Sequence, residues 1–171
     1  MIDPDYVRLM ARYNGWQNRQ LTDALDGVAL EVLREDHGAF FGSILGTLSH
    51  ILWADRVWMH RFAPDRIEAP DRGIPDSPEL CPTFGVWSAE RFAMDGRIGL
   101  WADRLHAVDL TGDLRWMSGT LGREVSKPVA LCVVHMFNHQ THHRGQVNAM
   151  MTRAGLPAPV TDLFAMPEEG A

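Results

Sequence analysis

A long stretch without proline, residues 129–153, carries four of the chain's eight histidines within nine positions. Pro128 suits the first position of a helix, and Gly155 followed by Pro157 suits its end. We therefore predict a single helix over this stretch. At ~100° per residue, one face of the helix presents a mixed row of polar and apolar side chains. They are Cys132, His135, His139, His143, Gln146 and Met150.

The histidines of this face are spaced for metal binding. Side chains four residues apart on a helix point the same way, so His139 and His143 can bind one metal ion through two ring nitrogens. His135 lies one turn away, and His142 is turned aside. The cysteine and methionines nearby indicate that the face looks inward, where imidazoles without partners are costly. The pattern therefore favours a metal site over a solvated helix face, with a further ligand from elsewhere in the chain.

Three other stretches have the apolar spacing of amphipathic helices. We expect them at residues 3–27, 39–62 and 83–107, the first capped by Asp3 and the third by Thr83. The second has Phe41 on its apolar stripe. His50 lies on the opposite side, among small residues that leave room near the imidazole. Both sides of this helix are therefore expected to be buried.

The remaining segments connect these helices. Residues 28–38 form a link whose conformation the sequence leaves open. Residues 63–82 hold half of the chain's ten prolines, which predicts a long crossover loop that passes the end of a helix bundle. Residues 114–118 and 123–127, separated by a glycine-bounded turn, indicate a small β-hairpin before the last helix.

Length and composition predict one domain, residues 1–171, that ends in a short tail, residues 156–171. In that tail Thr161 is expected to cap a turn at residues 163–166. A net charge of -6 with scattered basic residues argues against a nucleic-acid partner. The apolar runs are too short to span a membrane, and the first residues do not resemble a secretory signal. With two isolated cysteines, the chain is expected to be cytoplasmic.

Other kinds of histidine site fit this sequence less well. It contains no Glu-x-x-His, which argues against a di-iron carboxylate site, and no His-Glu-x-x-His, the mark of a zincin. A Cys-x-x-Cys-His attachment site for haem is absent as well.

Several short motifs resemble those of the DinB family. Each motif is weak alone, whereas the combination is specific and extends from the first helix to the tail. The motifs are Tyr13-Asn14-x-Trp16, Gly46-Thr47-Leu48-x-His50, Asp55-Arg56-x-Trp58, His139-Gln140-x-His142-His143-Arg144-Gly145-Gln146 and Thr161-Asp162-Leu163.

This resemblance implies an all-α fold, a four-helix bundle with a crossover topology, often assembled as a homodimer. It also implies that three histidines hold one divalent metal ion, commonly zinc or nickel. By position these ligands are His50, His139 and His143. His135 and His142 match no ligand position, and whether either contributes to the site stays open. Relatives include metal-dependent transferases of low-molecular-weight thiols, an isomerase that uses such a thiol, and proteins proposed as metal-dependent hydrolases.

We therefore expect a mononuclear metalloenzyme, either a thiol transferase or a hydrolase. Asn138 and Gln146 are candidates for orienting the ligands, and Asp55 or Asp162 for an acid-base group. A cation deprotonates a thiol without any protein base, so we favour a low-molecular-weight thiol as the small-molecule partner. A non-catalytic metal-binding or ligand-sensing bundle is the alternative, and a structural dimer with a vestigial site is a third hypothesis.

Overall fold

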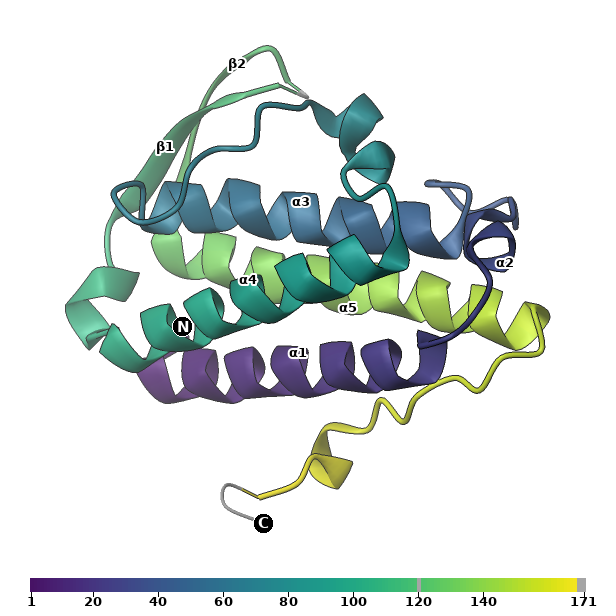
Figure 1. Cartoon of the computed structure of the whole chain (residues 1–171). Helices are drawn as coiled ribbons and strands as arrows, with labels where there is room; N and C mark the ends of the chain where they lie inside the picture. Colours follow the sequence, from purple (N-terminus) through teal and green to yellow (C-terminus); the bar gives the residue numbers. More distant parts are fainter. Residues whose placement is uncertain (120, 169–171) are drawn as a thin grey trace.

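The computed structural model of the chain describes residues 1–119 and 121–168. The fold is mostly helical with a small two-stranded antiparallel sheet (Figure 1). The α-helices are α1 (Pro4–Leu25), α2 (Leu30–Arg34), α3 (Ile44–Phe62), α4 (Phe84–Arg104) and α5 (Val129–Arg153). The strands are β1 (Asp113–Ser118) and β2 (Arg123–Pro128), and the 3-10 helices are η1 (Ile74–Glu79), η2 (Ala107–Leu110) and η3 (Leu163–Ala165). Thr120 of the predicted hairpin turn and residues 169–171 of the predicted tail lie outside the described residues.

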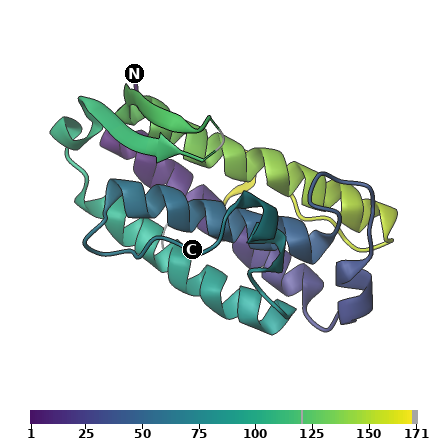
Figure 2. The same ribbon diagram turned by 90° about the horizontal axis from the view of Figure 1, so that it is seen from above.

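The long helices are α1, α3, α4 and α5, which lie side by side and run in two opposite directions. α1 and α5 run one way, and α3 and α4 run the other (Figure 1 and Figure 2). α1 packs against α4 and α5, and α3 packs against the same two helices. No helix in the described part of the chain combines the length and the apolar character needed to cross a membrane. The pairing of α3 with α5 brings histidines from two distant stretches of the sequence within reach of one another.

The segment between α3 and α4 runs back along α3 (Figure 1). Its path is marked by contacts of His60 with the Ile67 carbonyl at 2.7 Å, Trp53 with the Arg72 carbonyl at 2.8 Å, and His50 with the Ser77 hydroxyl at 2.8 Å. Positions on α3 fall as positions in the segment rise, so the two run antiparallel. The prediction of a loop across the end of the helices was wrong, because the segment's polar groups find partners along α3. This return makes α3 and α4 parallel.

α3 begins at Ile44, whereas the sequence predicted a helix from residue 39. Ser43 caps the helix by accepting a hydrogen bond from the Gly46 N–H at 3.0 Å. Before the cap the chain turns sharply, with Gly42 at a φ of 72° that favours glycine. Phe41 therefore lies outside the helix and not on its apolar stripe.

The other helix ends agree with the sequence or differ in detail. Asp3 and Thr83 cap α1 and α4 through their side chains, as predicted. Pro128 is the last residue of β2 and has extended backbone angles, so it is not the first helical residue of α5. The link that the sequence left open contains α2. The predicted cap by Thr161 was wrong, because η3 follows Asp162 and has no side-chain cap.

A buried ion pair joins α3 to α4. Arg91 and Asp55 are each 1% exposed and lie 2.5 Å apart, and Arg91 also contacts Asp95 at 2.9 Å. Gln140 of α5 donates a hydrogen bond to the other carboxylate oxygen of Asp55 at 2.7 Å. Burial raises the pKa of Asp55, although Arg91 and Gln140 oppose this. Buried charges are costly unless they are well partnered, so this arrangement favours one alignment of the three helices.

α1 joins the same group of side chains through two asparagines. Asn14 and Asn18 donate to Asp95 at 3.2 and 2.9 Å, and Asn14 also accepts a hydrogen bond from Arg144 of α5. Burial lowers the pKa of Arg144 to about 10. We call these residues the buried polar cluster: Asn14, Asn18, Asp55, Arg91, Asp95, Gln140 and Arg144. The cluster links all of the long helices.

Replacing Arg91 by Ala is expected to lower the free energy of unfolding by about 3–5 kcal/mol, because Asp55 would stay buried without its cation. Arg56 is a matched control, since it pairs with Glu90 across the same two helices at 2.5 Å but closer to solvent. Arg56→Ala is expected to cost at most about 1 kcal/mol. Urea unfolding followed by circular dichroism measures both, and equal losses would contradict the importance of burial for the first pair.

Candidate metal centre

Three histidine side chains meet between α3 and α5. His50 lies on the second turn of α3, and His139 and His143 lie one turn apart on α5. The Nε2 atoms of His50 and His139 are 3.2 Å apart, and one ring nitrogen from each histidine lies within 4.8 Å of the other two. His50 and His143 are only 4% and 8% exposed. The structure thus brings together the three residues to which the sequence motifs pointed.

The hydrogen bond at Nδ1 of His50 leaves its Nε2 unprotonated and able to bind a metal. Its Nδ1 lies 2.8 Å from Ser77 Oγ, and the Ser77 hydroxyl donates to the Ile74 carbonyl at 2.6 Å. Because that donation uses the only hydroxyl proton, Ser77 accepts a hydrogen bond from the Nδ1–H of His50. A neutral His50 then carries its lone pair on Nε2, the atom nearest His139.

His143 is held in the same tautomer by Gln146. Its Nδ1 lies 2.7 Å from Gln146 Oε1, and an amide oxygen can only accept, so the Nδ1–H donates. The amide nitrogen of Gln146 lies 3.5 Å from His142 Nε2, which agrees with this orientation of the amide. Gln146, a sequence candidate for orienting a ligand, therefore contacts His143 directly and leaves its Nε2 unprotonated.

Aromatic rings enclose His50. Phe41 stacks on the imidazole with ring centroids 3.7 Å apart, and Trp53 lies nearly parallel to it at 5.7 Å. The position of Phe41 depends on Gly46, because a Cβ at residue 46 would lie 2.7 Å from the Phe41 carbonyl oxygen. Such a contact is too close for any real side chain, so the chain before α3 can approach His50 only if residue 46 is glycine.

The sequence did not identify Phe41 or Ser77 as site residues. The sequence assigned Phe41 to a helix. The signal against this is Ser43, which can cap a helix three residues before Gly46 and so places Phe41 before the helix begins. Ser77 lies between α3 and α4, in residues 63–83, which we call the return segment. The sequence of this segment shows no helical or strand periodicity. Its contact with His50 spans 27 positions, so no local pattern indicates it.

Three side chains of α5 do not enter the histidine cluster: His135 and His142, whose contribution the sequence left open, and Asn138, a predicted candidate. His135 is exposed and packs edge-on against Trp58, with ring centroids 5.0 Å apart. His142 is exposed beside His143 at a centroid distance of 4.9 Å. Asn138, predicted to orient a ligand, is also exposed. A helix places these positions about 100° from their neighbours, which turns Asn138 and His142 away from α3.

The two predicted acid-base candidates lie elsewhere as well. Asp55 belongs to the buried polar cluster, where Arg91 and Gln140 occupy its two oxygens. Asp162 precedes η3 in the exposed tail. Among the described residues, no Asp, Glu or Cys joins the three histidines in a metal-binding group.

Burial keeps the three imidazoles neutral at pH 7. It lowers the pKa of His50 to about 3, with a further contribution from His143. It also lowers the pKa of His139 to about 3, with His143 and His50 adding to the effect. The pKa of His143 is lowered by burial, against the hydrogen bond to Gln146. Neutral imidazole is the form that binds a metal ion.

These donors fit one divalent metal ion. Two nitrogens at the usual zinc-imidazole distance and a tetrahedral angle are about 3.3 Å apart. The Nε2 atoms of His50 and His139 lie 3.2 Å apart. A site with three protein ligands leaves room for an exogenous ligand, which is the arrangement of catalytic rather than structural zinc sites.

Comparisons with known proteins agree on one family. The model of the DinB family matches residues 1–170. Protein DinB of Bacillus subtilis is 22% identical over 160 residues, which cover 92% of this chain and 91% of that protein. The crystal structure of a DinB-like protein from Bacillus cereus matches with a TM-score of 0.64 and 19% identity, over 86% of this chain and 90% of that one. At this identity the structural likeness establishes the fold alone.

The metal-free protein is expected to lose stability as the pH falls from about 6.5 toward 3. His50 and His139 have folded-state pKa values of about 3, against an ordinary 6.5, so the unfolded chain takes up protons first. The stability that these two histidines contribute is fully present above pH 6.5 and is lost progressively as the pH falls toward 3. Urea unfolding of chelator-treated protein at several pH values measures the loss.

A matched pair of variants isolates the histidine contribution to this pH dependence from that of the carboxylates. His50→Gln should reduce the loss of stability between pH 6.5 and 4, because one buried imidazole no longer titrates. His106→Gln, at an exposed position, should leave it unchanged. The same pH dependence in both variants would contradict the assignment.

Ser77→Ala is expected to weaken metal binding by about 10- to 100-fold, because His50 would lose the partner that fixes its tautomer. Asn138→Ala serves as the control, since this polar side chain lies next to a cluster residue in the sequence but points to solvent. Competition with a chromogenic zinc chelator measures both affinities. An effect of Asn138→Ala as large as that of Ser77→Ala would contradict the role assigned to Ser77.

Proposed function

The chain belongs to the DinB family, as its motifs predict, and from this premise we propose that it is a mononuclear metal-dependent enzyme. In this proposal His50, His139 and His143 hold one divalent ion, and α1, α3, α4 and α5 form a four-helix bundle. Zinc and nickel both suit imidazole ligands. The observation that supports the proposal most directly is the convergence of three neutral imidazoles, two of them with Nδ1 protonated and Nε2 unprotonated.

A divalent ion at this site supplies Lewis acidity, which lowers the pKa of a thiol or a water molecule toward neutrality. The protein's side chains hold the ligands and limit access of water. Ser77 and Gln146 keep His50 and His143 in the ligating tautomer, while Phe41 and Trp53 cover His50 with apolar surface. Apolar cover of this kind strengthens the electrostatic effect of a cation.

The absence of a carboxylate from the histidine group, among the described residues, favours thiol transfer over hydrolysis. A thiol that loses its proton at the site becomes a nucleophile without a protein base, whereas hydrolysis gains from one. Asp55 is not available for that role, because Arg91 and Gln140 engage it. We therefore propose a low-molecular-weight thiol as the substrate and keep a metal-dependent hydrolase as the second activity.

A non-catalytic metal-binding or ligand-sensing protein is the competing function. The low exposure of His50 and His143 favours it, because a buried ion exchanges its ligands less readily. Access for an exogenous ligand separates the two proposals. A thiol that reaches the site supports the enzyme, and a site closed to small ligands supports the binding protein.

Two further parts of the proposal concern assembly and location. On α4 the residues Phe92 and Leu100 are 79% and 57% exposed. Exposed apolar side chains on one helix suit the homodimer that the family resemblance implies. Cys81 and Cys132 are buried and unpaired, which suits the reducing cytoplasm. Analytical ultracentrifugation tests the first, and localisation in the native cell tests the second.

Adding glutathione to cobalt-loaded protein is expected to produce a thiolate-to-cobalt charge-transfer band, because the sulfur of a substrate thiol would share the site with the histidines. S-methylglutathione has no ionisable thiol and should leave the absorption spectrum unchanged. Should glutathione also have no effect while the protein hydrolyses ester probes in a His50-dependent way, the hydrolase would replace the transferase.

Two alanine variants decide whether this band reports on the proposed ligands. His139→Ala should lose both the bound cobalt and the band. His142→Ala should retain both, although it removes an imidazole from the same helix one residue before His143. One metal ion per chain, measured by elemental analysis, is expected for the unchanged protein and for His142→Ala. A ratio near zero in the unchanged protein would contradict the proposal of a metalloenzyme.

A further inference from the structure

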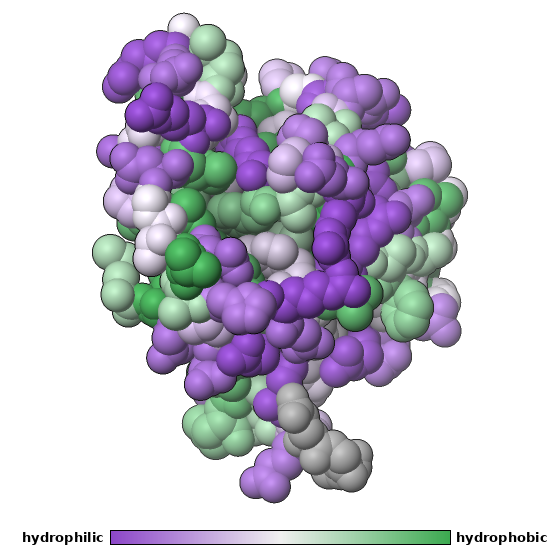
Figure 3. Space-filling model, turned by 90° about the vertical axis from the view of Figure 1, so that its left-hand side faces the viewer, coloured by the Kyte–Doolittle hydropathy of each residue, from purple (hydrophilic) through white to green (hydrophobic). Residues whose placement is uncertain are grey.

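A cavity of about 600 Å³ lies at the end of the molecule where α3 and α4 finish. The last turns of both helices line it, together with the start of the return segment and η2. Figure 3 views this end and shows apolar side chains in a hollow with hydrophilic residues around it. Met59, at the near edge, lies nine residues after His50, which corresponds to about 14 Å along α3. The cavity is therefore separate from the histidine cluster.

One wall of the cavity is flat and aromatic. The rings of Phe62 and Trp101 stack with centroids 5.3 Å apart and an interplanar angle of 12°. Ile67 and Leu105 extend this wall with aliphatic surface. A flat apolar surface of this size in a concave site suits the flat body of a small ligand.

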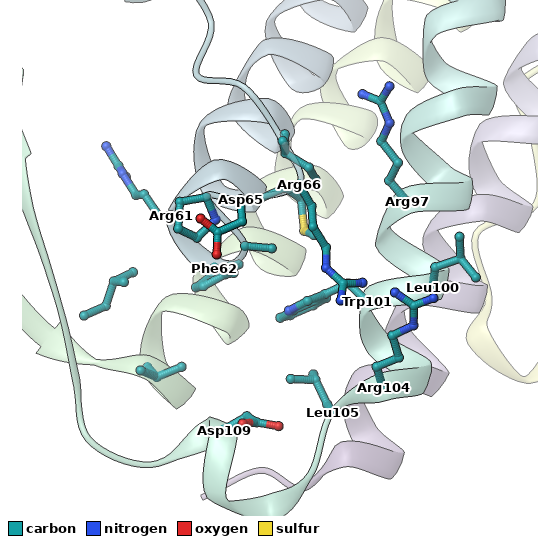
Figure 4. A pocket seen from close by; sticks show the side chains of 16 residues that line it. Arg61, Phe62, Asp65, Arg66, Arg97, Leu100, Trp101, Arg104, Leu105 and Asp109 are labelled. Atoms are coloured by element: carbon teal, nitrogen blue, oxygen red, sulfur yellow. The ribbon is translucent and has the colours of Figure 1, made fainter.

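Two guanidinium groups at this cavity have no carboxylate partner among the described residues. Arg66 lies just beyond α3, and Arg104 lies in the last turn of α4; both are exposed and line the cavity. Figure 4 shows both side chains reaching toward the region of Trp101. In the part of the chain that the structure describes, neither arginine forms an ion pair. Two cations at one cavity repel each other, and an anion between them would relieve that repulsion.

The other arginines at the cavity are placed differently. The guanidinium of Arg61 lies over the rings of Trp58 and Trp116, at 4.6 and 5.0 Å from their centroids. Arg97 also lines the cavity, but its side chain extends away from Trp101 (Figure 4). Neither therefore competes with Arg66 and Arg104 for a ligand in the cavity.

The negative groups at the cavity do not neutralise this charge. Asp109 accepts a hydrogen bond from the His106 N–H at 2.9 Å and so caps η2. Asp65 is exposed. The ends of α3 and α4 add partial negative charge, which Arg104 offsets in part. Stabilising a helix end needs no cavity and no aromatic wall, so this role alone does not account for the arrangement.

We propose that this cavity is a binding site for a small organic anion, a carboxylate carried on a flat apolar body. The carboxylate lies between Arg66 and Arg104, each of which can donate paired N–H groups to it. The apolar body lies against Phe62 and Trp101. The site needs no metal ion, so it is independent of the function proposed for the histidine cluster.

Equilibrium dialysis of 2-naphthoate against chelator-treated protein tests this site. Chelation removes any ion at the histidines, to which a carboxylate would otherwise bind. One saturable site per chain is expected, and Arg66→Gln or Arg104→Gln should each weaken binding by about tenfold, the usual effect of losing one charge-assisted hydrogen bond. The neutral analogue 2-naphthalenemethanol has the same rings and should bind at least about tenfold more weakly than 2-naphthoate.

Arg97→Gln is the matched control, because it removes the same charge from the same helix as Arg104 but from a side chain that extends away from Trp101 (Figure 4). It should leave the affinity unchanged. The three arginines are exposed, so the variants should keep the helical circular dichroism of the unchanged protein. No saturable binding at millimolar 2-naphthoate, an equal loss in all three variants, or no loss in Arg66→Gln and Arg104→Gln would each overturn the proposal.

Discussion

The ion pair between Asp55 and Arg91 is the interaction on which the alignment of the long helices depends. A buried charge tolerates few arrangements, because any displacement leaves it without a partner in a region that water does not reach. Asp55 uses one oxygen for Arg91 of α4 and the other for Gln140 of α5. Gln140 follows His139 directly, and Asp55 lies five residues after His50. The hydrogen bond from Gln140 to Asp55 thus also fixes where His139 lies along the helix axis relative to His50.

This coupling explains how a candidate metal centre can be built from histidines of two helices. A slip of one helical turn, about 5.4 Å, would leave the Nε2 atoms of His50 and His139 too far apart for one ion. Apolar packing alone tolerates such slips more readily, since aliphatic side chains interdigitate in several ways. The buried polar cluster therefore supplies specificity of alignment, while the apolar core supplies most of the favourable burial.

The sequence contained the local part of this structure and not the part that depends on distant contacts. The spacing of His139 and His143 follows from helical geometry, so it could be predicted from residues 129–153 alone. His50 could be suggested only by its setting and by the family resemblance. The partner of its Nδ1, Ser77, could not be predicted, because the return segment is held by hydrogen bonds to α3 rather than by its own periodicity. Phe41 was misplaced for a related reason: apolar spacing continued past the cap at Ser43.

Gly46 influences the histidine cluster although it is not one of the three histidines. Only hydrogen at this Cα allows the Phe41 carbonyl to approach, so the aromatic cover of His50 and the first turn of α3 are sterically linked. In a relative with a larger residue here, the chain before α3 would have to take another path and Phe41 would leave the imidazole. The size of one side chain in the first turn of α3 therefore sets how open the histidine cluster is.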